Sequence, residues 1–161
     1  MGSGKTTIGK LLATKMGYDF VDMDKHIEQK LFKSVSQIFA EQGEDEFRIL
    51  ERQCLHEVAE FTHTIISTGG GAPCFFDNME FMNSHGLTIY LKLTPQELAN
   101  RLETSRANIR PLLAGRKGEE LIQFISNGLA TREPFYAQAA FHTNGTIDEI
   151  VSQIFNFVSR R

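Results

Sequence analysis

Several features are scarce in this sequence of 161 residues, and each scarcity excludes a class of protein. No apolar stretch approaches the roughly 20 residues needed to cross a bilayer, because Lys, Glu or Gly interrupts the longest ones. Nothing at the amino terminus resembles a signal peptide, and Cys54 and Cys74 stand alone without the spacing of a CxxC or metal motif. We therefore expect a protein of the reducing cytoplasm that does not span a membrane.

The net charge of the chain is also small. A net charge of −3 and a pI near 6.0 provide no global field that would gather nucleic acid or an anionic membrane, so we expect neither as a partner. Any anion site must be local. The five histidines show no metal-ligand spacing, and we expect surface or helix-end roles for them. They are His26, His56, His63, His85 and His142.

What is present describes one globular domain, since 41% of the residues are apolar and 23% are charged. Helical and strand-like patterns alternate along it. Strands are predicted at 18–21, 64–67, 87–93 and near 141, and helices at 4–16, 25–32, from 34 to a break at 43, 47–61, near 79–82, 95–102, 121–125 and 150–158. This alternation predicts a parallel sheet covered on both faces, with ligands beyond the carboxyl ends of its strands.

The first predicted helix opens from a glycine-rich turn that predicts a phosphate site. Gly4, Lys5 and Thr6 fill the last three places of the pattern GxxxxGK[ST]. Glycines let backbone N–H groups surround phosphate oxygens, a lysine supplies a point charge, and a threonine hydroxyl can bind magnesium. The residues predicted to bind the nucleotide here are Gly2, Ser3, Gly4, Lys5, Thr6 and Thr7.

The pattern's first glycine would lie three residues before Gly2, and the strand that normally precedes such a loop is not in the sequence. That strand is usually central, so its loss would leave neighbouring strands with unpaired backbone groups. We interpret Met1 as an internal methionine; the alternative is a compromised core.

Further motifs follow the loop, and in this order they resemble the shikimate kinase family over nearly the whole chain. The motifs are Asp22-Met23-Asp24, Phe47-Arg48, Gly69-Gly70-Gly71, Arg110-Pro111-Leu112-Leu113, and Arg132 within Thr131-Arg132-Glu133-Pro134-Phe135-Tyr136. The resemblance implies an α/β fold with three α/β/α layers and a mostly five-stranded parallel sheet of the P-loop kinase type, here without its first, central strand. It also implies a single domain over 1–161 with a mobile lid at about 104–118.

The same resemblance implies a kinase that transfers the γ-phosphate of ATP to the 3-hydroxyl of shikimate with Mg²⁺, acting as a monomer. On the nucleotide side, it implies that Thr6 and Asp22 hold the metal, that Lys5 and Arg110 meet the phosphates, and that Arg101 lies near adenine.

On the acceptor side, the resemblance implies that Asp24 hydrogen-bonds the hydroxyl and takes its proton. Arg48 and Arg132 would bind the substrate carboxylate, for which a planar guanidinium is suited. The N–H groups of Gly69, Gly70 and Gly71 would bind hydroxyls or the carboxylate.

Each of these residues has a simpler interpretation when taken alone. Asp24 could be the N-cap of a helix at 25–32, Asp22 a surface acid, Arg48 an exposed ion pair with a neighbour one turn away, and residues 69–71 a plain loop. Two functional alternatives also stay open: a related small-molecule kinase resembling gluconate kinase, and a nucleotide-binding protein without kinase activity.

Overall fold

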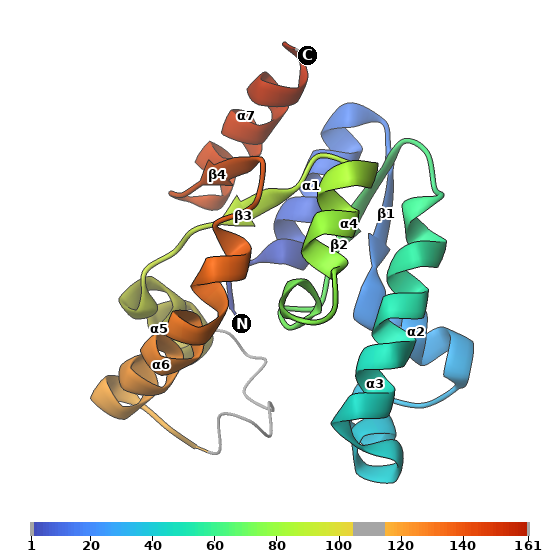
Figure 1. Ribbon diagram of the computed structural model, residues 1–161. Coiled ribbons are helices and arrows are strands. Elements are labelled where there is room, and N and C mark those ends of the chain that lie inside the picture. Colours follow the sequence, from blue (N-terminus) through green and yellow to red (C-terminus); the bar gives the residue numbers. More distant parts are fainter. Residues whose placement is uncertain (1, 105–114, 161) are drawn as a thin grey trace.

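The computed structural model describes residues 2–104 and 115–160, in which helices and strands alternate as predicted (Figure 1). In chain order the elements are α1 (Lys5–Met16), β1 (Asp19–Asp22), α2 (Met23–Leu31), α3 (Val35–Ala59), β2 (Thr64–Ser67), the 3₁₀ turn η1 (Ala72–Cys74), α4 (Asn78–His85), β3 (Ile89–Leu91), α5 (Pro95–Thr104), α6 (Gly118–Tyr136), β4 (Phe141–Thr143) and α7 (Ile147–Val158). None of the helices in this part of the chain is long and apolar enough to span a bilayer.

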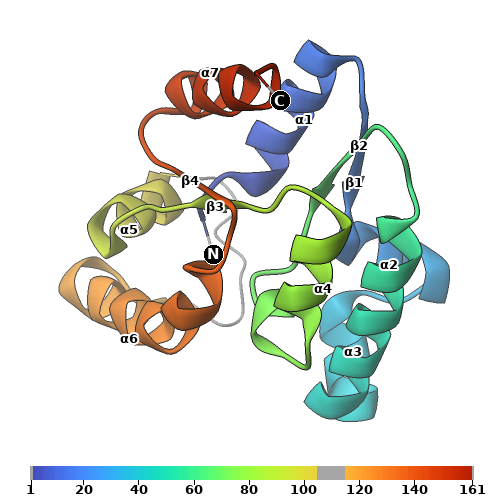
Figure 2. The same cartoon turned by 45° about the horizontal axis from the view of Figure 1, so that its top comes forward.

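The strands form two parallel pairs. β1 pairs with β2, with Asp19 opposite Thr64, and β3 pairs with β4, with Ile89 opposite Phe141. The parallel pairing is confirmed, but the mostly five-stranded sheet is not: in residues 2–104 and 115–160 there are four strands in two separate sheets. Figure 2 shows β1 and β2 on the side of α2 and α3, and β3 and β4 on the side of α5 and α6.

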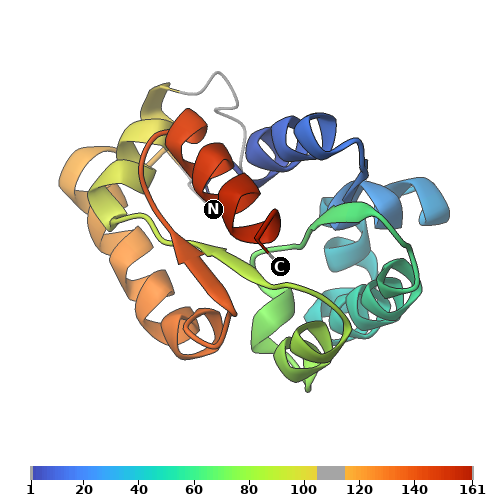
Figure 3. The same ribbon diagram turned by 90° about the horizontal axis from the view of Figure 1, so that it is seen from above.

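Helices pack against both faces of the strands. Successive residues of a strand point to opposite faces, so each face has apolar side chains of its own to cover. Ile65 of β2 and Ile89 of β3 pack into one cluster with Ile8 of α1 and Ile154 of α7, so α1 and α7 lie over both sheets on the same face (Figure 3). The next residue of β2, Ile66, packs instead against the core formed by α2 and α3. β2 is therefore covered on both faces, as predicted.

The helices predicted from 34 and at 95–102 begin where expected, directly after Ser34 and Thr94. Ser34 Oγ accepts from the Gln37 N–H at 3.1 Å while the Gln37 side chain accepts from the Ser34 N–H at 2.8 Å. Thr94 and Glu97 form the same reciprocal pair before α5. Such capping boxes satisfy N–H groups that a helix start leaves unpaired.

Two predicted helix boundaries differ from the structure. α3 is one element from Val35 to Ala59, although Gly43 inside it has φ 82° and ψ 176°, so the predicted break is a kink. The helix predicted at 121–125 is longer in the structure, because α6 continues through Pro134 to Tyr136. Contacts outside the helix offset the cost of the proline, since the Tyr136 hydroxyl donates to the Gly70 carbonyl.

Candidate functional site

The phosphate loop leads directly into α1, whose first residue is Lys5. Gly2 and Gly4 have φ of 70° and 87°, which side chains rarely adopt, and a Cβ on Gly2 would lie 2.8 Å from Leu102 Cγ. The first turn of α1 carries no acidic residue. Its first N–H groups point out of the helix and carry partial positive charge, so this turn is suited to bind an anion.

Thr6 and Asp22 form the oxygen pair predicted to hold magnesium. The Thr6 hydroxyl donates to Asp22 Oδ2 at 2.9 Å. Two adjacent ligands of an octahedral Mg²⁺ at about 2.0–2.1 Å lie about 3 Å apart, and a Mg²⁺ site commonly uses one or two protein oxygens with waters and substrate phosphates. The pair therefore fits the ion in both spacing and chemistry.

Asp22 and Asp24 are separated by the boundary between β1 and α2. Asp22 is the last residue of β1, and its Oδ1 accepts from the Lys25 N–H at 3.3 Å, so Asp22 is the N-cap of α2. The alternative that Asp24 caps this helix is therefore wrong. Asp24 lies in the first turn, with Oδ1 at 3.2 Å from the point that a Cβ on Gly69 would occupy. The change from strand to helix directs the two carboxylates to different neighbours, Asp22 to Thr6 and Asp24 to Gly69.

The triple glycine after β2 is where the predicted acceptor residues meet. A Cβ on Gly71 would lie 2.6 Å from Arg48 Nη1, and a Cβ on Gly70 would lie 3.6 Å from Arg132 Nη1. A Cβ on Gly69 would lie 2.6 Å from Glu51 Oε1, next to Asp24. Side chains from α2, α3 and α6 thus contact this backbone directly, which explains the glycines at 69 and 71.

Arg48 is held in one orientation. Its Nη1 donates to Glu51 Oε2 at 2.8 Å, its Nη2 donates to Glu44 Oε1 at 3.0 Å, and its guanidinium lies over the Phe75 ring at 4.1 Å. The simple interpretation of Arg48 as an exposed ion pair along the helix is right about its partners. It is wrong about exposure, because the Arg48 side chain is only 12% exposed. Stacking and two ion pairs fix the planar fork that a carboxylate would bind.

Glu51 belongs to this site, although it was not predicted. Its side chain is 2% exposed, and burial raises its pKa even though Arg48 favours the charged form. A buried carboxylate of this kind needs a hydrogen-bonded cation. The spacing of three residues from Arg48 was the available signal, but it is equally typical of a solvent-exposed pair.

Arg132 lies on the part of α6 that contacts both the glycines and β3. Four residues further on, Tyr136 donates to the Gly70 carbonyl, and burial raises the Tyr136 pKa. Glu133 accepts from the Tyr90 hydroxyl at 2.6 Å and pairs with Lys92 at 3.1 Å. These contacts fix the orientation of the helix that presents Arg132.

Arg101 contacts the phosphate loop from α5. Its Nη1 donates to the Ser3 carbonyl at 2.9 Å, and its Nη2 donates to the Gly145 carbonyl at 3.1 Å. The structure thus brings Arg101 to the nucleotide side of the site; its predicted proximity to adenine stays a prediction. Arg110 and most of the predicted lid at 104–118 lie outside the described residues.

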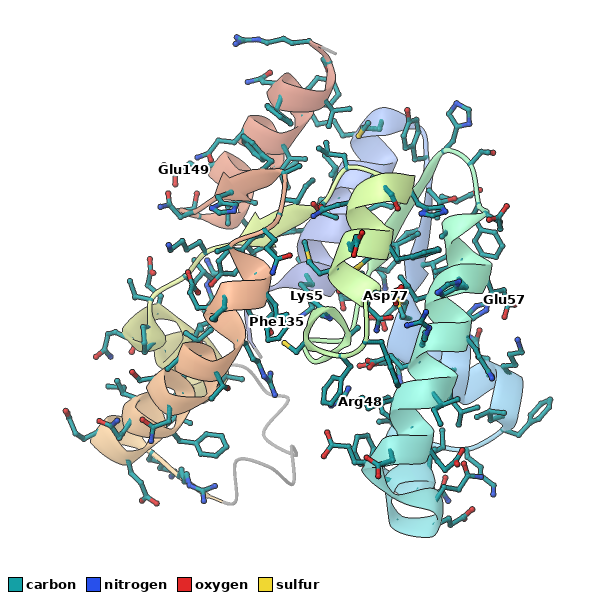
Figure 4. All side chains as sticks on the ribbon, in the orientation of Figure 1. Lys5, Arg48, Glu57, Asp77, Phe135 and Glu149 are labelled. Carbon is teal, nitrogen blue, oxygen red and sulfur yellow. The ribbon has the colours of Figure 1, made fainter. Side chains whose placement is uncertain are left out.

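The two halves of the site adjoin. Lys5 and Ser3 line the same cavity as Gly69 and Gly70. Figure 4 shows Lys5 and Arg48 in the central part of the molecule, between α3 and α6. A molecule bound at the glycine run would therefore lie beside one bound at the phosphate loop.

Comparisons with known proteins agree with this geometry. The chain is 59% identical to a shikimate kinase of Parabacteroides distasonis over 140 residues, which are 87% of the chain and 80% of that protein. It is 49% identical to a shikimate kinase of Bacteroides thetaiotaomicron over 160 residues, which are 99% of the chain and 91% of that protein.

Solved structures give the same result. The crystal structure of shikimate kinase from Bacteroides thetaiotaomicron superposes with a TM-score of 0.93 at 45% identity, covering 99% of this chain and 94% of that one. Shikimate kinase from Acinetobacter baumannii in complex with shikimate superposes with a TM-score of 0.85 at 32% identity, covering 99% and 89%. The family model for shikimate kinase matches residues 1–160. The chain therefore belongs to the shikimate kinase family.

Proposed function

We propose that this protein transfers the γ-phosphoryl group of ATP to the 3-hydroxyl of shikimate. The observation that carries the proposal is the convergence of Asp24, Arg48 and Arg132 on the glycines 69–71, directly beside the phosphate loop. Shikimate offers one carboxylate and three ring hydroxyls, which are the groups that two guanidiniums, a carboxylate and backbone N–H groups can recognise. The relative from Acinetobacter baumannii was solved with shikimate bound.

The proposed chemistry divides between the two halves. Asp24 accepts a hydrogen bond from the 3-hydroxyl, aims its oxygen at the γ-phosphorus and takes the proton as the new P–O bond forms and the bond to ADP breaks. Lys5 and the N–H groups at the start of α1 stabilise the charge on the transferred group, and Arg110 adds to this. A Mg²⁺ ion held by Thr6 and Asp22 would supply further charge neutralisation on the phosphates.

The acceptor claim is tested by a panel of acids under ATP consumption. We expect ADP release to require shikimate, to be far slower with gluconate, and to be weak with the methyl ester of shikimate, which lacks the carboxylate charge. ATP consumption that is the same with and without shikimate, or a preference for gluconate, would contradict the proposal.

The role of Asp24 is tested by Asp24→Asn, with Asp19→Asn as the control because Asp19 is an exposed acid at the start of β1. We expect Asp24→Asn to lower kcat by about 10²–10⁴-fold and Asp19→Asn to leave it unchanged. Calorimetry separates the binding-only alternative: shikimate that tightens ATP binding without any product would favour a nucleotide-binding protein.

We propose in addition that residues 1–161 act as one domain, as a monomer, in the cytoplasm. The parallel strands covered by helices, and the contacts of Glu133 in α6 with Tyr90 of β3 and with Lys92, support a single domain. Sedimentation at several concentrations measures the mass of the particle in solution; a dimer at assay concentration would contradict the monomer.

A further inference from the structure

The glycine run after β2 contains three consecutive peptide units, which are held in different ways. The unit between Gly69 and Gly70 is held through its carbonyl, because the Gly69 C=O accepts from the Ala72 N–H at 3.2 Å. The unit between Gly71 and Ala72 is held at both ends. Its N–H makes this same bond, and its C=O accepts from the Cys74 N–H at 2.9 Å. The local turn therefore fixes the first and the last of the three units.

The middle unit, between Gly70 and Gly71, takes part in neither of these bonds. Its C=O accepts instead from the hydroxyl of Tyr136, which lies 66 residues further along the chain, at the end of α6. The two glycines have no side chains whose packing could fix the unit. The orientation of this peptide therefore depends on α6 and not on the turn that contains it.

A peptide between two glycines turns over easily. A flip of the rigid unit changes ψ of the first residue and φ of the second by about half a turn. Gly71 has φ −86°, so a flip would bring it to about +94°, a value that glycine adopts freely and other residues avoid. Because the C=O and N–H of a trans peptide point in opposite directions, a flip would also reverse the Gly71 N–H. The Tyr136 hydroxyl thus selects one of two orientations.

Tyr136 also links this peptide to Arg132. The two residues are one turn apart on α6, so they lie on the same face of the helix. A Cβ on Gly70 would lie 3.6 Å from Arg132 Nη1 and 3.7 Å from the Tyr136 hydroxyl oxygen. The Tyr136 ring packs on the Tyr90 ring of β3, with 5.1 Å between the centroids, which limits its movement. The same turn of α6 therefore presents a guanidinium and sets the direction of a backbone N–H.

We propose that Tyr136 is a positioning residue of the acceptor side. Its hydroxyl holds the peptide between Gly70 and Gly71 in the orientation in which the Gly71 N–H donates to an oxygen of the acceptor. This inference rests on the proposed function, because it assigns the N–H to the same acceptor. Without the hydroxyl the peptide populates both orientations, and acceptor binding weakens as the populated fraction of the competent orientation falls.

The kinetic test is Tyr136→Phe, which removes only the hydroxyl. We expect the KM for shikimate to rise about three- to tenfold, the range by which a neutral hydrogen bond shifts an equilibrium, with kcat and the KM for ATP little changed. para-Aminophenylalanine at position 136 restores a donor at the same place and should bring the KM back. Tyr18→Phe is the matched control, since Tyr18 lies between α1 and β1 and contacts the His63 ring.

Tyr90→Phe separates this role from a general effect on the helix. It removes the bond to Glu133 in α6 but leaves the Tyr136 hydroxyl in place. We expect a smaller rise in the KM for shikimate than in Tyr136→Phe. An equal rise would assign the effect to the placement of α6 and overturn the proposal.

A second readout does not need kinase activity. In crystal structures we expect one orientation of the Gly70 carbonyl in the unchanged protein, and a reversed or a second orientation in Tyr136→Phe. A single unchanged orientation in the variant would show that the hydroxyl does not hold the peptide, whichever molecule the acceptor is. A carbonyl that turns over while the KM for shikimate stays the same would show that the Gly71 N–H does not bind the acceptor. Failure to phosphorylate shikimate would refute the proposed function, and the carbonyl would still decide the role of the hydroxyl.

Discussion

The residues proposed to bind the nucleotide follow one another in the sequence, from Gly2 to Thr7, whereas those proposed to bind the acceptor come from four segments between residues 24 and 132. The proposed phosphate contacts are backbone N–H groups at a helix start, which need only the local conformation. The proposed acceptor contacts are instead side chains held by packing, such as Arg48 over Phe75. Substitutions should therefore separate the two sides: changes in the loop should affect the chemical step, and changes in packing should affect shikimate binding.

The largest effect is expected from Lys5→Met. Loss of the charge proposed to meet the transferred phosphoryl group should lower kcat by about 10²–10³-fold and change the KM for shikimate little. A coupled assay of ADP release measures both constants. Lys10→Met, an exposed lysine of the same helix, is the matched control. An Lys5→Met enzyme with near-normal kcat would remove Lys5 from the chemistry.

Gly71→Ala, which adds a single methyl group, should disrupt the acceptor side. In Gly71→Ala the new Cβ would lie 2.6–2.7 Å from the two terminal nitrogens of Arg48, so the guanidinium must move. We expect the KM for shikimate to rise roughly 10- to 100-fold, since a charged hydrogen bond is worth about 1.5–3 kcal/mol. The KM for ATP should stay the same. Gly128→Ala is the control, because a Cβ there contacts nothing within 4 Å. If the two variants behave alike, the close approach to Arg48 has no functional role.

A smaller effect, on the opposite side, is expected from Arg101→Met. The loss of the bonds to the Ser3 and Gly145 carbonyls should loosen the phosphate loop and raise the KM for ATP roughly tenfold. The KM for shikimate should change less than that for ATP. Arg160→Met, at an exposed arginine beyond α7, serves as the reference. A change in the KM for shikimate alone would show that Arg101 acts on the acceptor side and not on the phosphate loop.

The smallest effect concerns pH. The hydrogen bond from Tyr90 and the charge of Lys92 lower the Glu133 pKa. A carboxyl whose pKa is lowered by folding stabilises the protein at any pH above its unfolded-state pKa, which is near 4.3. This stabilisation is lost as the pH falls through the folded-state pKa. The pair is partly exposed, so Glu133→Gln should cost less than about 1 kcal/mol at pH 7 and nothing at the acid end.

Urea unfolding of Glu133→Gln at pH 7 and at pH 3 measures this difference, and Glu46→Gln, at an exposed acid of α3, is the control. A loss of stability that is as large at pH 3 as at pH 7 would mean that packing, not charge, joins Glu133 to β3.

Much of the fold was accessible from the sequence because the signals were local. The capping residues Ser34 and Thr94 mark helix starts through their own hydrogen bonds, and Gly43 marks a kink through its own φ. The end of α6 was missed for the opposite reason: Tyr136 bonds to Gly70, which lies 66 residues away, and this contact outweighs the local preference of Pro134 to end a helix.

In the candidate site, too, the sequence predicted some residues and missed another. The residue types at 24, 48, 69–71 and 132 predicted an acceptor site through a family resemblance, and the structure brings those residues together. Glu51 escaped prediction because its neighbours in the sequence look like a solvent-exposed charged face, and only the packing of the glycine run against α3 buries it.

The sequence by itself determined the phosphate loop, the alternation of helices and strands, and the residue types of the acceptor site, because each is set by a residue and its near neighbours. The tertiary structure alone decided that Arg48 is shielded and Glu51 buried, that α6 extends to Tyr136, and that the described strands form two sheets. The physical reason is that apolar periodicity records which face of an element is covered, but not which other element covers it.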